Sequence, residues 1–211
     1  MEKNVMIWGA TGGIGSALVR LLSSQGWKVS AFGRDFDQLQ GFDGYKIRVD
    51  LQSESNVEAV VAAIGKTVAS YDWFIYAAGD ILLRSFDKMS LAEWRRIQDA
   101  NLNGMITALH YSLPLLTPEA PVYLIGAVSK RLQLAGMAAY AAAKAGVEAF
   151  ATVLAKDLDR PVVLLRPGAV MTQLWEKVPF KPPPGALGAD DFARLVYEAY
   201  QDHYHQVFLD I

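Results

Sequence analysis

The chain alternates from end to end between short apolar runs and longer segments in which apolar residues recur at helical spacing. Most of the short runs are continuously apolar, which is typical of strands that are buried on both faces of a parallel sheet. We expect seven strands, at residues 5–8, 27–32, 45–49, 73–76, 122–125, 162–165 and 207–209.

The segments between these runs predict helices, because their apolar residues recur every three or four positions. We expect a first helix that begins in the glycine-rich segment after residue 8 and ends at a C-cap at Gly26, and a second helix over residues 57–64. A third helix should begin at a capping box formed by Ser90 and Glu93 and run towards Leu116. We expect a fourth over the alanine-rich residues 138–158 and a fifth that begins at a cap at Asp190. Strands that alternate with helices indicate an α/β fold, doubly wound and Rossmann-like, with three layers and a mainly parallel seven-stranded sheet. No break in composition divides the chain, so we expect one domain over residues 1–211.

Composition and charge narrow the classes of function. The chain has 211 residues, of which 52% are hydrophobic and 20% charged, and this balance excludes a disordered chain. The net charge of −2 argues against a nucleic-acid partner. No apolar stretch approaches the roughly 20 residues that span a bilayer, and the first apolar run is too short for a signal peptide, so we expect no membrane partner and a cytoplasmic location. With no cysteine and three histidines, neither a disulfide nor a metal site is expected.

A glycine-rich loop joins the first predicted strand to the first predicted helix. It reads Gly9-Ala10-Thr11-Gly12-Gly13-Ile14-Gly15, and a helix N-terminus behind such a loop offers free N–H groups to a phosphate. Its spacing differs from the usual Gly-x-Gly-x-x-Gly pattern of dinucleotide-binding domains. The sequence therefore predicts a phosphate-binding turn.

The end of the second predicted strand distinguishes between the two nicotinamide cofactors. Gly33 stands where an acidic residue would bind the ribose of NAD, and Arg34 follows it, as suits the 2′-phosphate of NADP. We therefore favour NADP(H) over NAD(H). The alternative is that Arg34 is an ordinary surface charge and that Asp35 holds the ribose.

Tyr140 and Lys144 lie four residues apart in the alanine-rich helix, so they share one face of it. A nearby ammonium lowers the pKa of a tyrosine, and a phenol tuned in this way can exchange a proton with an alcohol or carbonyl oxygen. The spacing alone is a weak signal, because it equally describes a pair on a helix surface.

Together these motifs resemble those of the short-chain dehydrogenase/reductase family in its single-domain form. Gly9, Gly13 and Gly15 match its glycine motif, and Asn101 falls in an Asn-Leu-Asn-Gly segment that matches the one carrying the family's catalytic asparagine. The resemblance implies further cofactor contacts at Thr11, Gly12, Ile14, Asp50, Leu51, Ala77, Ala78, Gly79, Pro167, Gly168, Val170 and Thr172. Ala77 and Ala78 replace two asparagines of the family motif.

The resemblance also implies catalytic roles. Tyr140 would be the general acid/base, Lys144 would hold the nicotinamide ribose and lower the Tyr140 pKa, and Asn101 would anchor a water in a proton relay. Ala127 occupies the usual place of the family's serine, and Ser129 takes that role if the following loop is shorter than usual. Otherwise the site lacks that hydroxyl.

The implied activity is hydride transfer between NADP(H) and a small carbonyl or alcohol substrate, under an apolar lid at residues 173–189. The alternative for this segment is an ordinary surface loop. The family commonly forms homodimers or homotetramers through the helices that carry Asn101 and Tyr140, and Ala138, Ala139, Ala142 and Ala145 would either allow that close approach or face the sheet. The alternative is a non-catalytic NADP-binding or regulatory protein, because Ala127 and the two replaced asparagines depart from the family pattern. The spacing of Gly9, Gly12 and Gly15 also fits the family's extended branch, but few residues follow Thr172 for that branch's large substrate region.

Overall fold

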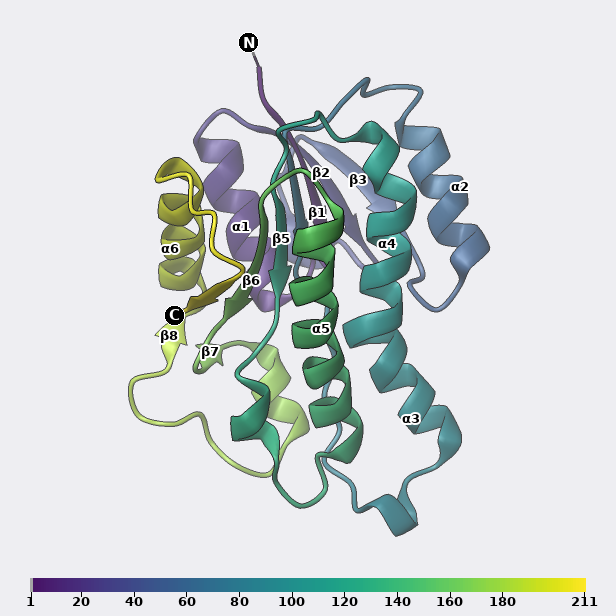
Figure 1. The fold of residues 1–211 in the computed structure, drawn as a ribbon, viewed down its shortest axis with the longest axis vertical. Coiled ribbons are helices and arrows are strands. Elements are labelled where there is room, and N and C mark those ends of the chain that lie inside the picture. Colours follow the sequence, from purple (N-terminus) through teal and green to yellow (C-terminus); the bar gives the residue numbers. More distant parts are fainter. Residues whose placement is uncertain (1) are drawn as a thin grey trace.

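The computed structural model describes residues 2–211, and its centre is one seven-stranded sheet with the order β3-β2-β1-β4-β5-β6-β9 (Figure 1). The strands are β1 Asn4–Trp8, β2 Lys28–Gly33, β3 Tyr45–Arg48, β4 Trp73–Tyr76, β5 Val122–Ile125, β6 Val162–Arg166 and β9 Phe208–Asp210. Each predicted strand is present, and every neighbouring pair is parallel. The predicted doubly wound, Rossmann-like fold is confirmed, and its sheet is wholly rather than mainly parallel.

Helices cover both faces of the sheet and complete the three predicted layers (Figure 1). The helices are α1 Gly13–Ser24, α2 Glu54–Ile64, α3 Leu91–Gln98, α4 Gly104–Ser112, α5 Ala138–Asp157 and α6 Ala189–Gln201. In β1, Val5 and Ile7 pack into the core on the α1 and α6 side, whereas Met6 and Trp8 pack on the side of α2, α4 and α5. Burial of alternate residues on opposite faces explains why the strands read as continuous apolar runs.

Two of the predicted helix caps are present, and one is wrong. Gly26 ends α1 with a φ of +82°, and the N–H of Trp27 donates to the carbonyl of Leu22 as in a Schellman motif. Ser90 and Glu93 form the predicted capping box of α3. However, α6 begins one residue before Asp190, with Gly188 as its N-cap. Asp190 instead lies in the first turn, where the positive end of the helix dipole stabilises its charge.

The long helix predicted from Ser90 towards Leu116 is interrupted in the middle. After α3 the chain forms one π-helical turn, Asp99–Asn103, before α4 begins. A π-turn accommodates one extra residue in a helix and is frequent at functional sites. Here it buries the side chain of Asn101 completely.

The predicted lid has secondary structure of its own. Two short strands, β7 Val170–Met171 and β8 Leu187–Gly188, pair in parallel and close the ends of the segment. Between them lies a 3-10 turn, Gln173–Lys177. Figure 1 shows the segment in yellow-green beside the carboxyl ends of β5 and β6.

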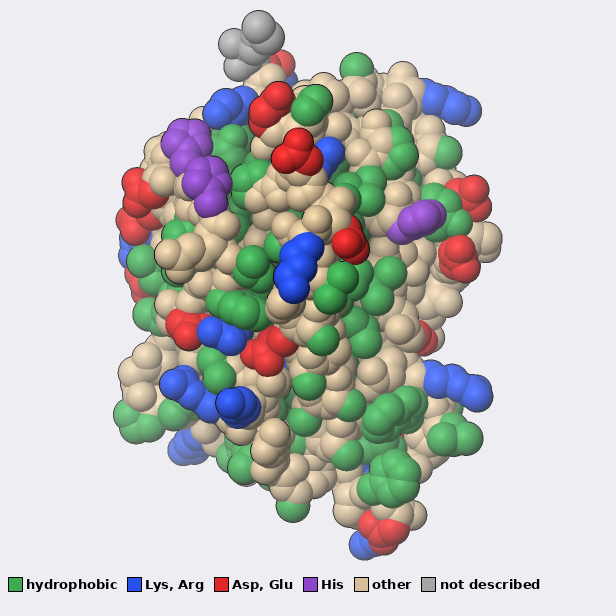
Figure 2. Space-filling view, in the orientation of Figure 1, with side chains coloured by type: hydrophobic (Ala, Val, Ile, Leu, Met, Phe, Trp, Pro, Cys, Tyr) green, Lys and Arg blue, Asp and Glu red, His purple; other side chains and the backbone are tan. Residues whose placement is uncertain are grey.

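The alanine-rich helix α5 exposes one apolar face. Ala138, Ala142 and Ala145 are exposed on it, whereas Ala139 is buried. Figure 2 shows hydrophobic side chains along the middle of the face over α4 and α5, with few charged side chains among them. No helix within residues 2–211 is long and apolar enough to cross a membrane.

Candidate active site

The glycine loop lies where the carboxyl ends of β1 and β4 meet, and its glycines are required by close contact. A Cβ on Gly9 would lie 2.3 Å from the backbone nitrogen of Ala78, and Gly9 also has a φ of +77°. A Cβ on Gly15 would lie 2.1 Å from the carbonyl oxygen of Gly9. In an open parallel sheet, ligands bind in the crevice outside the carboxyl ends of strands where the strand order reverses, and the order reverses between β1 and β4.

The N-terminus of α1 opens onto this crevice. Its N-cap is Gly12, which is exposed and supplies no side-chain cap, and the first turn of the helix carries no acidic residue. No capping side chain therefore accepts a hydrogen bond from the first N–H groups of α1, and these groups can donate to a phosphate. A Cβ on Gly13 would lie 2.6 Å from Cγ2 of Thr172. The segment Pro167 to Thr172, which carries four of the predicted cofactor contacts, therefore passes over the same loop.

The residues that distinguish between NAD and NADP lie beside the glycine loop. The N–H groups of Gly9 and Ala10 both donate to the carbonyl of Phe32, at 2.9 and 3.0 Å, and bring the end of β2 to the loop. Arg34 is exposed there. The carboxylate of Asp35 accepts a hydrogen bond from the N–H of Asp37 at 3.1 Å, so it is already engaged in a turn.

Two of the predicted cofactor contacts, Asp50 and Leu51, lie after β3. Asp50 is exposed, and its carboxylate accepts from the N–H of Gln52 at 3.0 Å. Leu51 packs against the start of α4, because a Cβ on Gly104 would lie 3.0 Å from the Leu51 side chain. Both residues thus lie at the carboxyl edge of the sheet, together with the glycine loop.

Asn101 is held by two backbone carbonyls. Its Nδ2 donates to the carbonyl oxygen of Asp80 at 2.7 Å and to that of Ile97 at 2.8 Å. Its Oδ1 is buried and has no hydrogen-bond partner within the described chain. Because buried polar atoms are nearly always paired, this oxygen suits a bound water or ligand group. It lies beside Gly79, where a Cβ would come within 3.1 Å of it.

Tyr140 and Lys144 lie on α5 at the carboxyl end of β5. The Lys144 Nζ is buried, donates to the carbonyl of Ile125 at 3.1 Å, and lies 5.7 Å from the centre of the Tyr140 ring. The last residue of α3, directly before the π-turn, is fastened to the start of α5, because Nε2 of Gln98 donates to the carbonyl of Ala139 at 2.8 Å. The structure thus brings Tyr140, Lys144 and Asn101 to one end of the sheet.

The pKa of Tyr140 does not shift as the sequence predicted. Desolvation by burial raises the pKa of Tyr140 to about 12, and burial lowers the pKa of Lys144 to about 8. The expected lowering of the Tyr140 pKa by the ammonium is absent, because desolvation dominates and the Lys144 Nζ is directed to the carbonyl of Ile125.

Ser129 is bound to Glu148, which is not among the predicted site residues. Its hydroxyl donates to a carboxylate oxygen of Glu148, and its backbone N–H donates to the other oxygen at 3.1 Å. Glu148 lies one turn beyond Lys144 on α5 and also faces Arg166, whose guanidinium is 3.5 Å away. The four-residue spacing between Lys144 and Glu148 indicates that both residues lie on one face of α5. The sequence does not show that the loop carrying Ser129 packs against that face.

A second missed cluster surrounds Asp80, directly after the Ala77-Ala78-Gly79 segment. Its buried carboxylate binds the guanidinium of Arg96 from α3 and, at 2.5 Å, the ammonium of Lys177 from the lid. The acidic residue after Gly79 was visible in the sequence. Its partners were not, since Lys177 lies 97 positions further along the chain.

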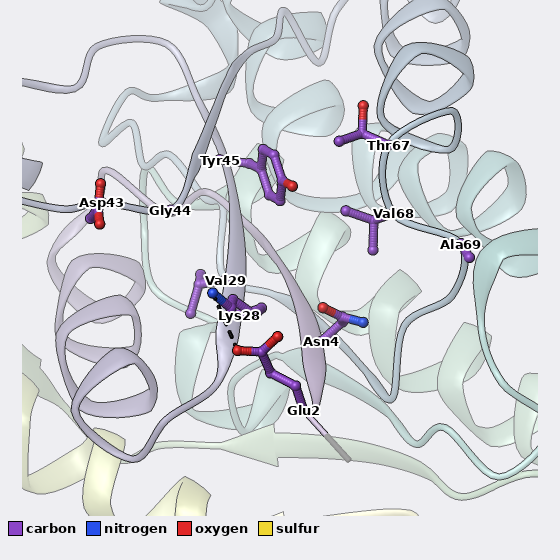
Figure 3. Close-up of a pocket in the computed structure, with 10 residues that line it drawn as sticks. All are labelled: Glu2, Asn4, Lys28, Val29, Asp43, Gly44, Tyr45, Thr67, Val68 and Ala69. Carbon is purple, nitrogen blue, oxygen red and sulfur yellow. Dashed lines mark ion pairs between the residues drawn. The ribbon is translucent and has the colours of Figure 1, made fainter.

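A separate hollow of about 640 Å³ lies at the other end of the sheet (Figure 3). It is lined at the amino ends of β1, β2 and β3 by Asn4, Val29 and Tyr45, with a Lys28–Glu2 ion pair at 3.2 Å. None of the predicted site residues lines it. Among residues 2–211, no group of three or more His, Asp or Glu side chains is arranged to hold a metal ion.

Comparison with known proteins identifies one family. A family model described as short chain dehydrogenase matches residues 3–182. The acetoacetyl-CoA reductase of Acinetobacter sp. is 30% identical over 189 residues, which cover 82% of this chain and 76% of that protein.

Solved structures show the same fold. The alcohol dehydrogenase of the archaeon Thermococcus sibiricus, complexed with 5-hydroxy-NADP, has a TM-score of 0.89 at 22% identity, covering 100% of this chain and 96% of that chain. The closed form of a serine dehydrogenase complexed with NADP+ has a TM-score of 0.86 at 24% identity, covering 99% of this chain and 94% of that chain.

Proposed function

The chain belongs to the short-chain dehydrogenase/reductase family and is thus an oxidoreductase of that type, and we propose that it transfers hydride between NADP(H) and a small carbonyl or alcohol substrate. One observation carries this proposal: Tyr140, Lys144 and Asn101 meet at the end of the sheet where the glycine loop also lies. We further propose one domain, with residues 173–189 as the substrate lid.

The residues around the crevice fit a dinucleotide. Gly9 and Gly15 leave no room for side chains, the N-terminus of α1 opens to an anion, and Oδ1 of Asn101 has no hydrogen-bond partner among residues 2–211. When bound, NADP(H) supplies or accepts the hydride. Arg34, which is exposed at the end of β2 beside the glycine loop, would bind the 2′-phosphate, and this position supports NADP over NAD.

Tyr140 would donate its phenolic proton to the substrate oxygen during reduction and accept it back during oxidation. Lys144 would hold the ribose of the cofactor with its ammonium. Because the Lys144 pKa is about 8, most of this ammonium is charged at neutral pH and can donate to the ribose hydroxyls. Asn101 would place a water at its unpaired oxygen and so connect Tyr140 to the solvent.

Ser129 is the proposed hydroxyl that contacts the substrate oxygen. To donate there, it must turn its proton away from Glu148. A hydrogen bond to a carboxylate is stronger than one between neutral groups, so Glu148 makes Ser129 a weaker donor than a free hydroxyl.

The substrate class follows from the lid. Trp175 and Phe180 lie with their ring centres 6.2 Å apart and supply apolar cover. A lid of this kind excludes water and orders the substrate. The short segment suits a small or flat carbonyl compound.

We also propose a homodimer or homotetramer that uses the apolar face of α5 and α4. Ala142, Ala145 and Val153 are exposed on that face, which lets two copies approach closely. Light scattering should give a multiple of the 23.1 kDa chain mass, and Ala145→Arg should shift the particle to monomer.

The function is tested by NADPH oxidation over a panel of small aldehydes, ketones, quinones and pterins. Turnover should fall roughly 10²- to 10⁴-fold in Tyr140→Phe, because the proton donor is lost. Binding of NADPH, followed by fluorescence, should be retained. Turnover that survives in Tyr140→Phe would contradict the mechanism.

The second candidate function is a non-catalytic NADP-binding or regulatory protein. The hydrogen bond from Ser129 to Glu148 and the alanine at position 127 favour it. Tight NADPH binding with no turnover on the whole panel would support this candidate, and absence of dinucleotide binding would overturn both.

A further inference from the structure

We propose that the carboxylate of Asp80 is a positioning residue that fastens the lid over the active site and links lid closure to the placement of Asn101. The inference rests on the proposed function, because it concerns the same site. It assigns a role to the Asp80 side chain and to Lys177, which the proposed chemistry does not use.

Asp80 is almost fully buried, and both of its carboxylate oxygens are engaged. Oδ1 accepts from the Lys177 ammonium at 2.5 Å and from the N–H of Ile81 at 2.9 Å, while Oδ2 accepts from the Arg96 guanidinium. A buried carboxylate is stable only when it is paired and hydrogen-bonded. The side chain of Asp80 therefore depends on contacts from two other segments, the lid and α3.

The lid has few other polar contacts with the body of the protein. Within the described chain, the remaining hydrogen bonds of residues 173–187 run to partners between positions 169 and 188, such as the Trp175 indole to the carbonyl of Val170 at 2.8 Å. The Lys177–Asp80 ion pair is thus the lid's polar connection to the end of β4.

The two cations on Asp80 come from different segments. Arg96 belongs to the helix α3, whereas Lys177 belongs to the lid, and their side chains are 39% and 47% exposed. When Lys177 leaves into water, Arg96 still neutralises the buried carboxylate, so opening does not strand an unpaired charge. Lys177 is therefore the exchangeable partner and Arg96 the permanent one.

Asp80 also connects this ion pair to the catalytic end of the sheet. Its backbone carbonyl accepts from Nδ2 of Asn101 at 2.7 Å, while its side chain holds Lys177. Closure of the lid adds a second cation to the one that already holds Asp80, whose backbone carbonyl orients Asn101. The lid thereby contacts the residue that places Asn101.

Hydrogen–deuterium exchange of residues 173–187 in the full chain, with and without NADPH, tests the fastening directly. Lys177→Gln removes the ion pair, and a half-exposed pair is worth roughly 0.2–1 kcal/mol, so exchange of the lid should become about two- to fivefold faster. Lys177→Arg should exchange as the wild type does. Lys181→Gln, an exposed lysine four residues further along the lid, is the matched control and should leave exchange unchanged.

The kinetic arm tests the link to Asn101. Lys177→Gln should raise KM more than it lowers kcat, because substrate is held less firmly while Arg96 still anchors Asp80. Asp80→Asn should lower kcat as well, and raised salt should speed lid exchange in the wild type but not in Lys177→Gln. Equal exchange in Lys177→Gln and Lys181→Gln would overturn the proposal. Hydrogen–deuterium exchange of the lid can be measured without turnover. Failure of the proposed function would be seen separately, because NADPH would then not bind.

Discussion

The two halves of the active-site crevice are built from different interactions. On the cofactor side, Gly9 and Gly15 are constrained by backbone atoms only 2.1 to 2.3 Å from where a Cβ would lie. On the substrate side, charged side chains from distant segments hold the parts together, as in Asp80 with Lys177. The first half is fixed by steric exclusion and should ignore pH and salt. The second depends on charge and should respond to both.

The largest expected effect on stability tests the close packing of the glycine loop. Gly15→Ala would put a methyl group against the Gly9 carbonyl, and backbone at that position cannot move cheaply. We expect a loss of about 3–5 kcal/mol in the free energy of unfolding and loss of NADPH binding. Urea denaturation and fluorescence titration measure the two effects.

Gly12→Ala is the matched control for this change. Gly12 has a φ of −81°, and a Cβ there would make an ordinary contact of 3.4 Å. Its free energy of unfolding should change by less than about 1 kcal/mol. Equal destabilisation in the two variants would show that the loop is not limited by close packing.

The next largest effect concerns the pH dependence of stability and tests the buried ammonium of Lys144. The Lys144 pKa is about 8 in the folded protein and about 10.4 in an unfolded chain, so the unfolded chain binds this proton more tightly between these values. The contribution of Lys144 to the free energy of unfolding should therefore rise with pH across this window, by up to about 3 kcal/mol. Buried tyrosines with raised pKa values, such as Tyr71 and Tyr140, act in the opposite direction near the top of the window, so the contribution is the difference between the wild type and a variant without the lysine. Denaturation midpoints at pH 7.5, 9 and 10 measure the slope.

Lys144→Met isolates that contribution, because it keeps an unbranched side chain and removes the titrating group. The variant should lose the rise in stability between pH 8 and about 10, measured against the wild type at each pH. Identical slopes in the two proteins would mean that Lys144 is not desolvated.

Ser129→Ala sharpens the contrast on the substrate side. We expect kcat/KM to fall about tenfold, because one hydrogen bond to the substrate oxygen is lost. Stability should fall by about 1 kcal/mol, since Glu148 loses a donor. A fall in stability with unchanged kinetics would leave Ser129 with Glu148 as its sole partner.

The smallest effect concerns cofactor choice. Arg34 is exposed, so its contact with a 2′-phosphate is screened, and Arg34→Ala should weaken NADPH about fivefold and leave NADH unchanged. Titration of both dinucleotides, with the exposed Arg95→Ala as control, measures the preference. An equal loss for NADH would contradict the assignment of the 2′-phosphate to Arg34.

The fold and the closely packed glycine loop could be predicted from the sequence because their causes are local. Continuous apolar runs such as Trp73–Tyr76 must be buried on both faces, and Gly9 to Gly15 form one contiguous motif. The substrate side could not be predicted in the same way. The contact of Ser129 with Glu148 and that of Asp80 with Lys177 exist only after distant segments pack.

Two further differences have the same origin. The pattern from Ser90 to Leu116 reads as one helix, because the apolar residues on each side of the Asn101 turn keep helical spacing and the sequence does not mark where a residue is added. The pKa of Tyr140 depends on how much solvent its surroundings exclude, and residue spacing carries no information about that.

The π-turn at Asn101 has a consequence for the geometry of the whole helical rod. One added residue changes the angular phase of a helix by about 100°. The segments before and after it can therefore aim their side chains in independent directions while sharing one axis, so Met105 and Leu109 stay directed at the sheet whichever way the preceding segment faces. Deleting one amino acid from this turn would restore an uninterrupted spiral and swing the asparagine amide out of the crevice.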